Sequence, residues 1–422
     1  MRKKTFRIVT LGCKVNQYDS QDMREKLLAA GLVEAAEGAQ ADICLVNTCT
    51  VTGKADKESL YSVRRLRREN PRARVVVTGC LAQRDAGRIA GADLILPNPK
   101  KKEIARALGL KAVTASGESI TSFKGHSRAF LKIQDGCDNF CSYCKVPFVR
   151  GRPESKPLEN VAAEAQALAE NGYREIVLTG ICLGSYGKDR RDGTSLVQAV
   201  EAVEKIGSVA RIRLSSIEAM QVTAALRRKL KEGGKLCPHL HVPLQSGDDA
   251  VLKRMNRPYT FRQFLSLIRG LQKTVKDFSF TTDIMVGFPG ETEREFRSSI
   301  EAVRKLKPLK THIFPFSARE GTMAASLPGR LPMDEIKRRV ADLAEAARKA
   351  GAAARGKFIG RRMEVLVETR SKHKPGFWEG YTANYLPLLI KCRGKVKVNS
   401  LFCARLLRQE GESIISACEK GR

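Results

Sequence analysis

Hydrophobic and polar positions alternate between strand-like and helix-like patterns over the first hundred residues. Short apolar runs that predict β-strands fall at residues 6–11, 42–46, 74–78 and 93–96. Helical patterns fill the gaps between them, near residues 19–30, 54–69 and 83–89. Strands that alternate with helices predict a parallel sheet covered by helices. We therefore expect an N-terminal α/β domain over residues 4–100.

The alternation returns beyond a segment rich in Lys, Gly and Ser, which we interpret as a linker over residues 101–126. Strand-like segments then follow at residues 130–133, 175–178, 211–214, 239–243, 278–285 and 311–316. Helical patterns between and after them include residues 158–171, 260–275, 292–306 and 333–354. Six such units predict a partial (β/α)6 barrel over residues 127–354, with its binding loops at the carboxyl ends of the strands.

Beyond residue 354 the pattern changes to short β-like runs separated by Gly and Pro. These runs fall at residues 362–369, 378–382, 386–391 and 395–398. They predict a small C-terminal β-barrel over residues 355–422. The fold class that we expect for the whole chain is α/β, with this β-barrel as its third part.

The charge of the chain points to a polyanionic partner. A count of 76 Lys and Arg against 45 Asp and Glu gives the 422 residues a net charge of +31, which favours RNA or DNA binding. No run approaches the ~18 apolar residues of a membrane span, and the apolar residues 6–11 are too few for a secretory leader. We therefore expect a cytoplasmic protein without a membrane partner, in which clustered cysteines serve metal or redox chemistry.

Three cysteines within eight residues follow the first predicted barrel strand, at Cys137, Cys141 and Cys144. Three thiolates can hold three corners of a [4Fe-4S] cluster and leave one iron free to bind S-adenosylmethionine. This spacing is the radical S-adenosylmethionine (SAM) signature, in which Tyr143 is placed to contact the adenine of the cofactor. The alternative is a structural zinc site, but such sites close with four ligands in paired spacing, and no His or fourth Cys lies nearby in the sequence.

Three further cysteines, Cys13, Cys49 and Cys80, each come directly after a different predicted strand of the N-terminal sheet. The carboxyl ends of parallel strands share one edge, which is where ligands bind. The three thiols would therefore converge and hold a second cluster. The alternative is that they are small buried hydrophobic residues, as free cysteines often are.

Two segments around the first cysteines carry a resemblance to a known family. Residues 10–20, TLGCKVNQYDS, and residues 47–52, NTCTVT, resemble the bacterial branch of the methylthiotransferase family that acts on threonylcarbamoyladenosine in tRNA. The isopentenyladenosine branch typically has YGCQMN and NTCSIR, and the ribosomal-protein aspartate branch typically has SLGCPKN and NTCGF. Further similar motifs lie at residues 178–181, 215–219, 241–247, 286–292 and 380–385.

The resemblance implies a radical SAM enzyme that converts N6-threonylcarbamoyladenosine at tRNA position 37 to its 2-methylthio derivative. It implies two [4Fe-4S] clusters and SAM as cofactors. The cluster on Cys137, Cys141 and Cys144 would cleave SAM, and the auxiliary cluster on the other three cysteines would supply sulfur. The implied partners are the tRNA anticodon loop with adenosine 37, bound in part by a TRAM-type C-terminal barrel, and an electron donor such as flavodoxin or ferredoxin.

Four other residues are candidates for binding the cofactor. Gly180 and Gly184 follow the second barrel strand, where missing side chains let the backbone approach SAM, although a plain turn is the alternative. Glu218 and Gln245 lie at later strand ends and could donate or accept hydrogen bonds. The chain departs from its relatives at Glu154, where they usually have Arg, and at Cys182, where they often have His.

Alternative functions remain open at this point. The same chemistry could act on isopentenyladenosine in tRNA or on a ribosomal-protein aspartate. A more remote alternative is a non-catalytic iron–sulfur protein that binds RNA.

Overall fold

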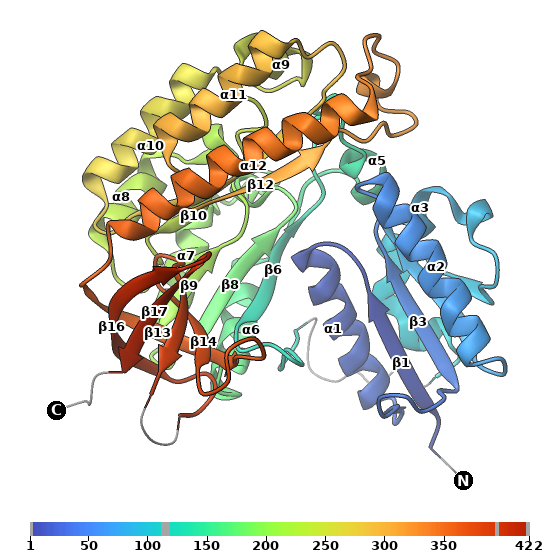
Figure 1. Cartoon of the computed structure of the whole chain (residues 1–422). Coiled ribbons are helices and arrows are strands. Elements are labelled where there is room, and N and C mark those ends of the chain that lie inside the picture. The colour runs from blue at the N-terminus through green and yellow to red at the C-terminus, as the bar shows by residue number, and fades with distance from the viewer. Residues whose placement is uncertain (1–2, 111–118, 393–395, 419–422) are drawn as a thin grey trace.

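The computed structural model describes residues 3–110, 119–392 and 396–418. Figure 1 shows the N-terminal sheet and its helices on one side, the central strands and their long helices above and opposite, and the C-terminal β-barrel below these. Helix α1 lies beside strand β6, so the first and second parts of the chain meet there. In the described residues, no helix is both long and apolar enough to cross a membrane.

The N-terminal sheet has five parallel strands in the order β2-β1-β3-β4-β5. The strands are β1 Thr5–Thr10, β2 Val33–Glu34, β3 Ile43–Thr48, β4 Arg74–Gly79 and β5 Leu94–Ile95. Its main helices are α1 Lys14–Ala29, α2 Gly53–Glu69 and α3 Cys80–Arg84. The four predicted strands are confirmed, and the two-residue β2 is an additional edge strand.

Alternation along the central strands explains why helices cover both faces of this sheet. Val46 and Val77 pack in one apolar cluster with Leu66 of α2. Their neighbours Leu45 and Val76 pack in another, with residues of α1. Successive strand residues point to opposite faces, so a strand that is apolar throughout has to be buried on both.

Part of the predicted linker belongs to the N-terminal fold. Residues 98–107 form the short helices η2 Asn98–Glu103 and α4 Ile104–Ala107. Ile104 is fully buried in the N-terminal core, and buried Lys101 pairs with Asp19 of α1. The linker prediction is therefore wrong for residues 101–107. Lys101 makes this segment look exposed in the sequence, but its ion pair with the distant Asp19 allows it to be buried. Residues 111–118 of the predicted linker lie outside the described residues.

Six parallel strands form the central partial barrel, as the sequence predicts. They are β6 Ala129–Asp135, β8 Glu175–Gly180, β9 Arg211–Leu214, β10 His239–His241, β11 Ser279–Val286 and β12 Lys310–Pro315. Two hydrogen-bonded sheets, β7-β6-β8-β9 and β10-β11-β12, are joined by single bridges such as Ser216 to His241. The edge strand β7 Glu154–Ser155 is antiparallel and contains Glu154, one of the two residues that depart from the family pattern.

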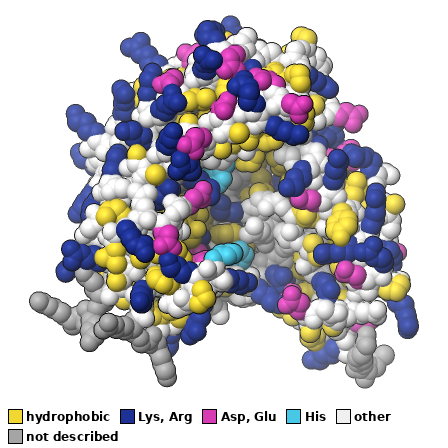
Figure 2. All heavy atoms as spheres, in the orientation of Figure 1, with side chains coloured by type: hydrophobic (Ala, Val, Ile, Leu, Met, Phe, Trp, Pro, Cys, Tyr) yellow, Lys and Arg dark blue, Asp and Glu magenta, His cyan; other side chains and the backbone are white. Residues whose placement is uncertain are grey.

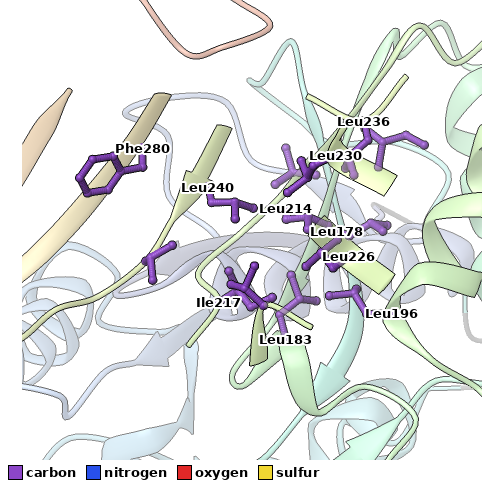
Figure 3. Packing of buried hydrophobic residues seen from close by; sticks show 14 of the residues in the cluster. Leu178, Leu183, Leu196, Leu214, Ile217, Leu226, Leu230, Leu236, Leu240 and Phe280 are labelled. Atoms are coloured by element: carbon purple, nitrogen blue, oxygen red, sulfur yellow. The ribbon is translucent and has the colours of Figure 1, made fainter. Parts of the chain in front are cut away.

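Helices cover the outside of the partial barrel. They include α5 Val146–Arg150, α6 Leu158–Glu170, α7 Leu196–Glu204, α8 Ala224–Glu232, α9 Asp249–Arg254, α10 Phe261–Thr274, α11 Glu293–Leu306 and α12 Met333–Gly356. Figure 3 shows the core between strands and helices, where Leu178, Leu214 and Leu240 lie near Leu226 and Leu230 of α8.

The C-terminal part is a closed barrel in the order β13-β14-β15-β17-β16. Its strands are β13 Arg362–Arg370, β14 Trp378–Thr382, β15 Pro387–Lys391, β16 Leu401–Glu410 and β17 Ser413–Cys418. The barrel is confirmed, but the predicted strand at 395–398 is wrong for residues 396–398, and residue 395 lies outside the described residues. The strands that close the barrel, β16 and β17, were not predicted. Cys392 and Cys418 form a disulfide inside this part.

Candidate active site

The first candidate site is the radical loop, residues 137–144, which follows β6 and carries Cys137, Cys141 and Cys144. Gly136 positions the start of the loop with φ +74°, and an added Cβ there would lie 2.0 Å from the carbonyl oxygen of Arg152. The Cys137 amide donates to the Gly151 carbonyl at 3.0 Å. The sequence therefore anchors the loop through backbone contacts that require glycine.

An arginine that the sequence patterns did not reveal contacts the radical loop. Arg257 donates from Nη1 to Sγ of Cys141 at 3.1 Å, and it forms an ion pair with Glu218, a predicted site residue. Burial opposes the charge of Arg257, but the neighbouring acidic and phenolic groups raise its pKa overall. Arg257 therefore remains a cation, and a cation beside sulfur suits a thiolate that ligates iron.

Cys182 lies beside the radical loop. Asn139 donates to its Sγ at 3.5 Å and Gln221 donates at 3.1 Å. A hydrogen bond with Cys137 is the main cause that lowers the pKa of Cys182, to about 6, and raises the pKa of Cys137. A fourth sulfur thus lies next to the three predicted ligands, although it is 38 residues or more away from them in the sequence.

The second candidate site is the N-terminal trio, Cys13, Cys49 and Cys80. Cys13 is the N-cap of α1 after β1, Cys49 follows β3, and Cys80 begins α3 after β4. These three strands are adjacent in the sheet, so their carboxyl ends bring the cysteines to one edge.

Close contacts surround Cys49 of the N-terminal trio. A Cβ at Gly12, whose φ is +93°, would lie 2.8 Å from Sγ of Cys49. Burial, followed by weaker effects that include Cys80 and Cys13, raises the pKa of Cys49 to about 11. Burial likewise raises the pKa of Cys144 to about 12. These thiols are therefore neutral without metal, and iron binding would release their protons.

The donor sets of both sites fit iron–sulfur clusters. Each predicted ligand set offers three thiols, and beside the radical loop Cys182 adds a fourth sulfur next to Cys137. Among the described residues, no histidine or carboxylate joins either set as a metal ligand. Cys13 is exposed whereas Cys49 and Cys80 are buried, so the N-terminal trio is open on the side of Cys13.

A central cavity of about 680 Å³ lies beside Cys13. Residues from all three parts of the chain line it, including Cys13 and Lys14, the inner side chains of the partial barrel, and Tyr381 and Tyr385 of the C-terminal barrel. Figure 2 shows the molecular surface hollowed between the two sides of the molecule, with histidine side chains in the hollow. The cavity volume is in the range of small-molecule sites.

The wall of the central cavity carries polar groups from β10, β11 and β12. His241 lies 3.1 Å from a carboxylate oxygen of Asp283 and 2.8 Å from the Thr281 hydroxyl. His241, Asp283 and His312 can bring one ligand atom each within 4.8 Å of one another. His241 begins the 241–247 motif, which is the only signal in the sequence that could have marked this group.

The C-terminal barrel is held against the central strands by two arginines of β9. Arg211 bonds to Glu364 and to the Tyr381 carbonyl, and Arg213 bonds to the Thr382 and Ala383 carbonyls. The guanidinium of Arg213 lies 4.7 Å from the ring centroid of Tyr385, which stacks on Tyr381. Both tyrosines are therefore fixed in the wall of the central cavity.

The remaining predicted cofactor residues lie in different settings. Tyr143 packs on the apolar cluster of Val251, Met255 and Phe288. A Cβ on Gly184 would lie 2.4 Å from Cβ of Gln221, and one on Gly180 would lie 2.9 Å from the Gln134 side chain. Gln245 has φ +68° and joins β11 through backbone hydrogen bonds. Packing alone accounts for the two glycines, so their role toward SAM stays a prediction.

Matches to known families cover both candidate sites. Residues 131–303 match the Radical SAM superfamily, and residues 5–95 match Uncharacterized protein family UPF0004. The chain is 38% identical to the Threonylcarbamoyladenosine tRNA methylthiotransferase MtaB of Chlamydia pneumoniae, over 98% of each chain. It is 40% identical to the enzyme of the same name from Thermotoga maritima, over 86% of this chain and 87% of that one.

The chain belongs to the radical SAM methylthiotransferase family. The predicted family, with relatives that carry the threonylcarbamoyladenosine name, and the predicted enzyme class are confirmed. Among solved structures, the radical SAM methyltransferase TsrM of Kitasatospora setae shares the fold, with a TM-score of 0.53 and 15% identity over 77% of each chain.

Several residues of this methylthiotransferase escaped the sequence patterns. The partners of Arg257 lie 116 and 39 residues away in the sequence, so no local spacing marks it. Near the N-terminal trio, Arg319 bonds to Thr50 at 2.9 Å, and Gly53 bonds to Ser317 at 3.1 Å. The loop after β12 thus supports the segment that follows Cys49.

Proposed function

We propose that this enzyme converts N6-threonylcarbamoyladenosine at position 37 of tRNA to its 2-methylthio derivative, with SAM and two [4Fe-4S] clusters. The observation that carries the proposal is the pair of three-cysteine sites, with Cys13 of the N-terminal trio opening into the central cavity. A cavity that all three parts of the chain line can receive the base in reach of the sulfur-bearing site.

Cys137, Cys141 and Cys144 would hold the SAM-cleaving cluster, and Cys13, Cys49 and Cys80 would hold the auxiliary cluster. When bound, these groups supply a radical able to break the unreactive C2–H bond of adenine and the sulfur that replaces the hydrogen. The protein then has to position the base and exclude water. Cys141 receives a hydrogen bond from Arg257, which Glu218 in turn orients.

The tRNA would approach the hollow between the two sides of the molecule. The net charge of +31 supports association with RNA phosphates. The stacked pair Tyr381 and Tyr385, with ring centroids 4.8 Å apart, offers an aromatic surface at the cavity. Bases of single-stranded RNA commonly stack on such side chains.

The physiological setting completes the proposal. We infer a cytoplasmic enzyme that receives electrons from a small carrier such as flavodoxin or ferredoxin. The supporting argument is chemical, because reductive cleavage of SAM needs one electron from outside the chain.

The proposed function is tested by nucleoside mass spectrometry of tRNA. Cells that lack this protein are complemented with the wild type or with Cys141→Ala. We expect 2-methylthio-threonylcarbamoyladenosine only with the wild type. An unchanged level in all strains would refute the substrate, and methylthiolated isopentenyladenosine or a modified ribosomal protein in its place would identify the other branches.

A further inference from the structure

Lys14 occupies a special position between the N-terminal trio and the partial barrel. It directly follows Cys13 and is the first residue of α1, and both residues line the central cavity. Its ammonium lies 6.0 Å from the ring centroid of Phe130, an inner residue of β6. A cation from the N-terminal domain thus extends toward the opposite wall, next to a predicted cluster ligand.

The other cations of the central cavity have partners within the protein. Arg128 pairs with Glu368 at 2.6 Å, and Arg213 pairs with Glu175 at 2.6 Å. Lys310 pairs with Glu412 at 2.9 Å. Arg355 is buried and faces the carbonyls of Leu309 and Gly411. Across residues 3–110, 119–392 and 396–418, Lys14 has no ion pair, so its charge is free for a ligand.

Two histidines of the cavity wall, His239 and His312, lie in settings that disfavour their charged form. Burial is the main cause that lowers the pKa of His239, and the charge of Arg213 adds to it. Burial also lowers the pKa of His312, where Asp283 opposes the effect only in part. These two imidazoles therefore do not compete with Lys14 for an anion.

The chemistry of the modified base matches this arrangement. In adenine, C2 and C6 both flank N1, so a substituent on N6 lies at the same edge of the ring as the C2–H bond. The threonylcarbamoyl group ends in a carboxylate. A base that presents C2 to the sulfur near Cys13 therefore brings an anion close to the residue that follows Cys13.

We propose that the Lys14 ammonium binds the carboxylate of the threonylcarbamoyl group and thereby selects the substrate. This inference rests on the proposed function and names a specificity-determining residue for it. Charge-assisted hydrogen bonds are among the strong ones in proteins. An uncharged, apolar N6 substituent would instead cover the ammonium without pairing it, which disfavours that substrate.

The test measures binding of anticodon stem-loop RNAs to the cluster-loaded enzyme without a reductant. The three RNAs carry threonylcarbamoyladenosine, its methyl ester, or isopentenyladenosine (also called dimethylallyladenosine) at position 37. The proteins are the wild type, Lys14→Gln, Lys14→Arg and the control Lys26→Gln. Lys26 lies on the same helix, outside the cavity lining, and pairs with Asp22 at 2.8 Å.

We expect Lys14→Gln to weaken binding of the carboxylate RNA by about tenfold to a hundredfold, the range for a hydrogen bond to a charged group. Binding of the ester and dimethylallyl RNAs should change little, so the preference of the wild type for the carboxylate disappears. Lys14→Arg should keep the preference, and Lys26→Gln should bind as the wild type does. Equal weakening for all three RNAs would overturn the proposal in favour of a phosphate contact, and no weakening would overturn it as well.

Two measurements separate this inference from the proposed function. Iron content shows whether Lys14→Gln still loads both clusters, and the ester comparison with wild-type protein tests charge recognition without any substitution. A wild type that binds carboxylate and ester RNAs equally refutes the role of Lys14. If the wild type binds both RNAs equally but still methylthiolates the carboxylate RNA, the proposed function remains intact.

Discussion

The radical loop and the N-terminal trio reach the same number of thiols from very different amounts of chain. The radical loop takes all three from residues 137–144, whereas the N-terminal trio takes one from the end of each of β1, β3 and β4. Local backbone contacts anchor the first site. Sheet register determines the second, so changes far from its cysteines should disturb it.

The difference in exposure is equally informative. Among the trio, Cys13 is exposed and borders the central cavity, while Cys141 of the radical loop is held by Arg257. The proposed function accordingly assigns the N-terminal trio to the side that meets the large substrate, and the radical loop to holding a cofactor. The comparison predicts that the two sites can be disabled separately.

The largest effect is expected for Cys141→Ala. Loss of one of three ligands from the radical loop should reduce formation of 5′-deoxyadenosine from SAM to background, because the cluster cannot be held there. The assay is chromatography of the products of the anaerobically reconstituted, reduced enzyme. The control is Cys403→Ala, which removes an exposed cysteine in β16. Cleavage at the wild-type rate in Cys141→Ala would show that the radical loop is not the ligand set.

Cys49→Ala should separate the two sites most clearly. We expect SAM cleavage to persist, methylthiolated product to disappear, and bound iron to fall by about half, because one of two four-iron clusters is lost. Iron analysis measures the bound iron, and mass spectrometry measures the methylthiolated product. Cys44→Ala, which removes a buried cysteine in the preceding strand, should retain the iron. Wild-type iron content in Cys49→Ala would contradict the second cluster.

Asp19→Asn tests the junction that supports both sites. Asp19 is buried in α1 and pairs with Lys101, Lys132 and Arg150. Removing the anion leaves buried Lys101 without its ion pair, while Lys132 and Arg150 keep Asp135. The uncompensated Lys101 should lower the free energy of unfolding by about 3 kcal/mol at pH 7. Denaturant unfolding measures the change, and Asp22→Asn on the same helix serves as the control.

The pH dependence of the Asp19 effect has a definite sign. Burial favours the protonated acid, but the charges of Lys101, Lys132 and Arg150 outweigh it and hold the pKa of Asp19 well below its ordinary value. A lowered pKa in the folded state contributes stability above the unfolded value of about 4, and that stability is lost as the pH falls below it. The difference between wild type and Asp19→Asn should therefore be constant from pH 7 to about 5 and shrink below about 4. A difference that grows in acid would contradict the ion pairs.

Gly79→Ala is expected to have the smallest effect, a modest loss of stability. Gly79 precedes Cys80 with φ +96°, and an added Cβ would lie 2.3 Å from the Thr48 carbonyl oxygen. Strain and overlap should together cost about 2 kcal/mol and displace Cys80 from Cys49. Iron content should fall while SAM cleavage persists. Gly31→Ala, with φ +86° and no atom within 4 Å of the added Cβ, controls for backbone strain alone. Equal iron content in the two variants would argue against register control of the N-terminal trio.

Periodicity was enough to predict most of the fold, because the strands that define each sheet are apolar and the helices between them are regular. It failed where contacts are distant in the sequence. Lys101 looks like part of an exposed basic run, yet its partner Asp19 lies 82 residues earlier. Strand β16 has only two fully buried residues, Ala404 and Leu406, and exposed residues that include the apolar Leu407 alternate with them, so its pairing with β13 and β17 leaves little local signal.

The candidate sites, too, could be predicted only where their signal is local in the sequence. Spacing alone marks the six cysteines as candidates, since clusters need thiols at strand ends or within one loop. Arg257 has no such spacing, and the roles of Cys182, which follows β8, and of Lys14, which follows Cys13, become visible only from the packing of the whole chain. Contacts between the predicted ligands and residues distant in the sequence depend on three-dimensional proximity, which a sequence pattern does not encode.

The depth of the central cavity also constrains the RNA. Its lining extends from Cys13 to the inner strands of the barrel and to Tyr381. On the proposed function, the target nucleotide would have to leave its stack to bring C2 to this place. The target base has to rotate out of the loop, at an unstacking cost of a few kcal/mol. Helical RNA is thereby disfavoured before any base is recognised. On the proposed function, extrusion of the base would thus be the first selection step.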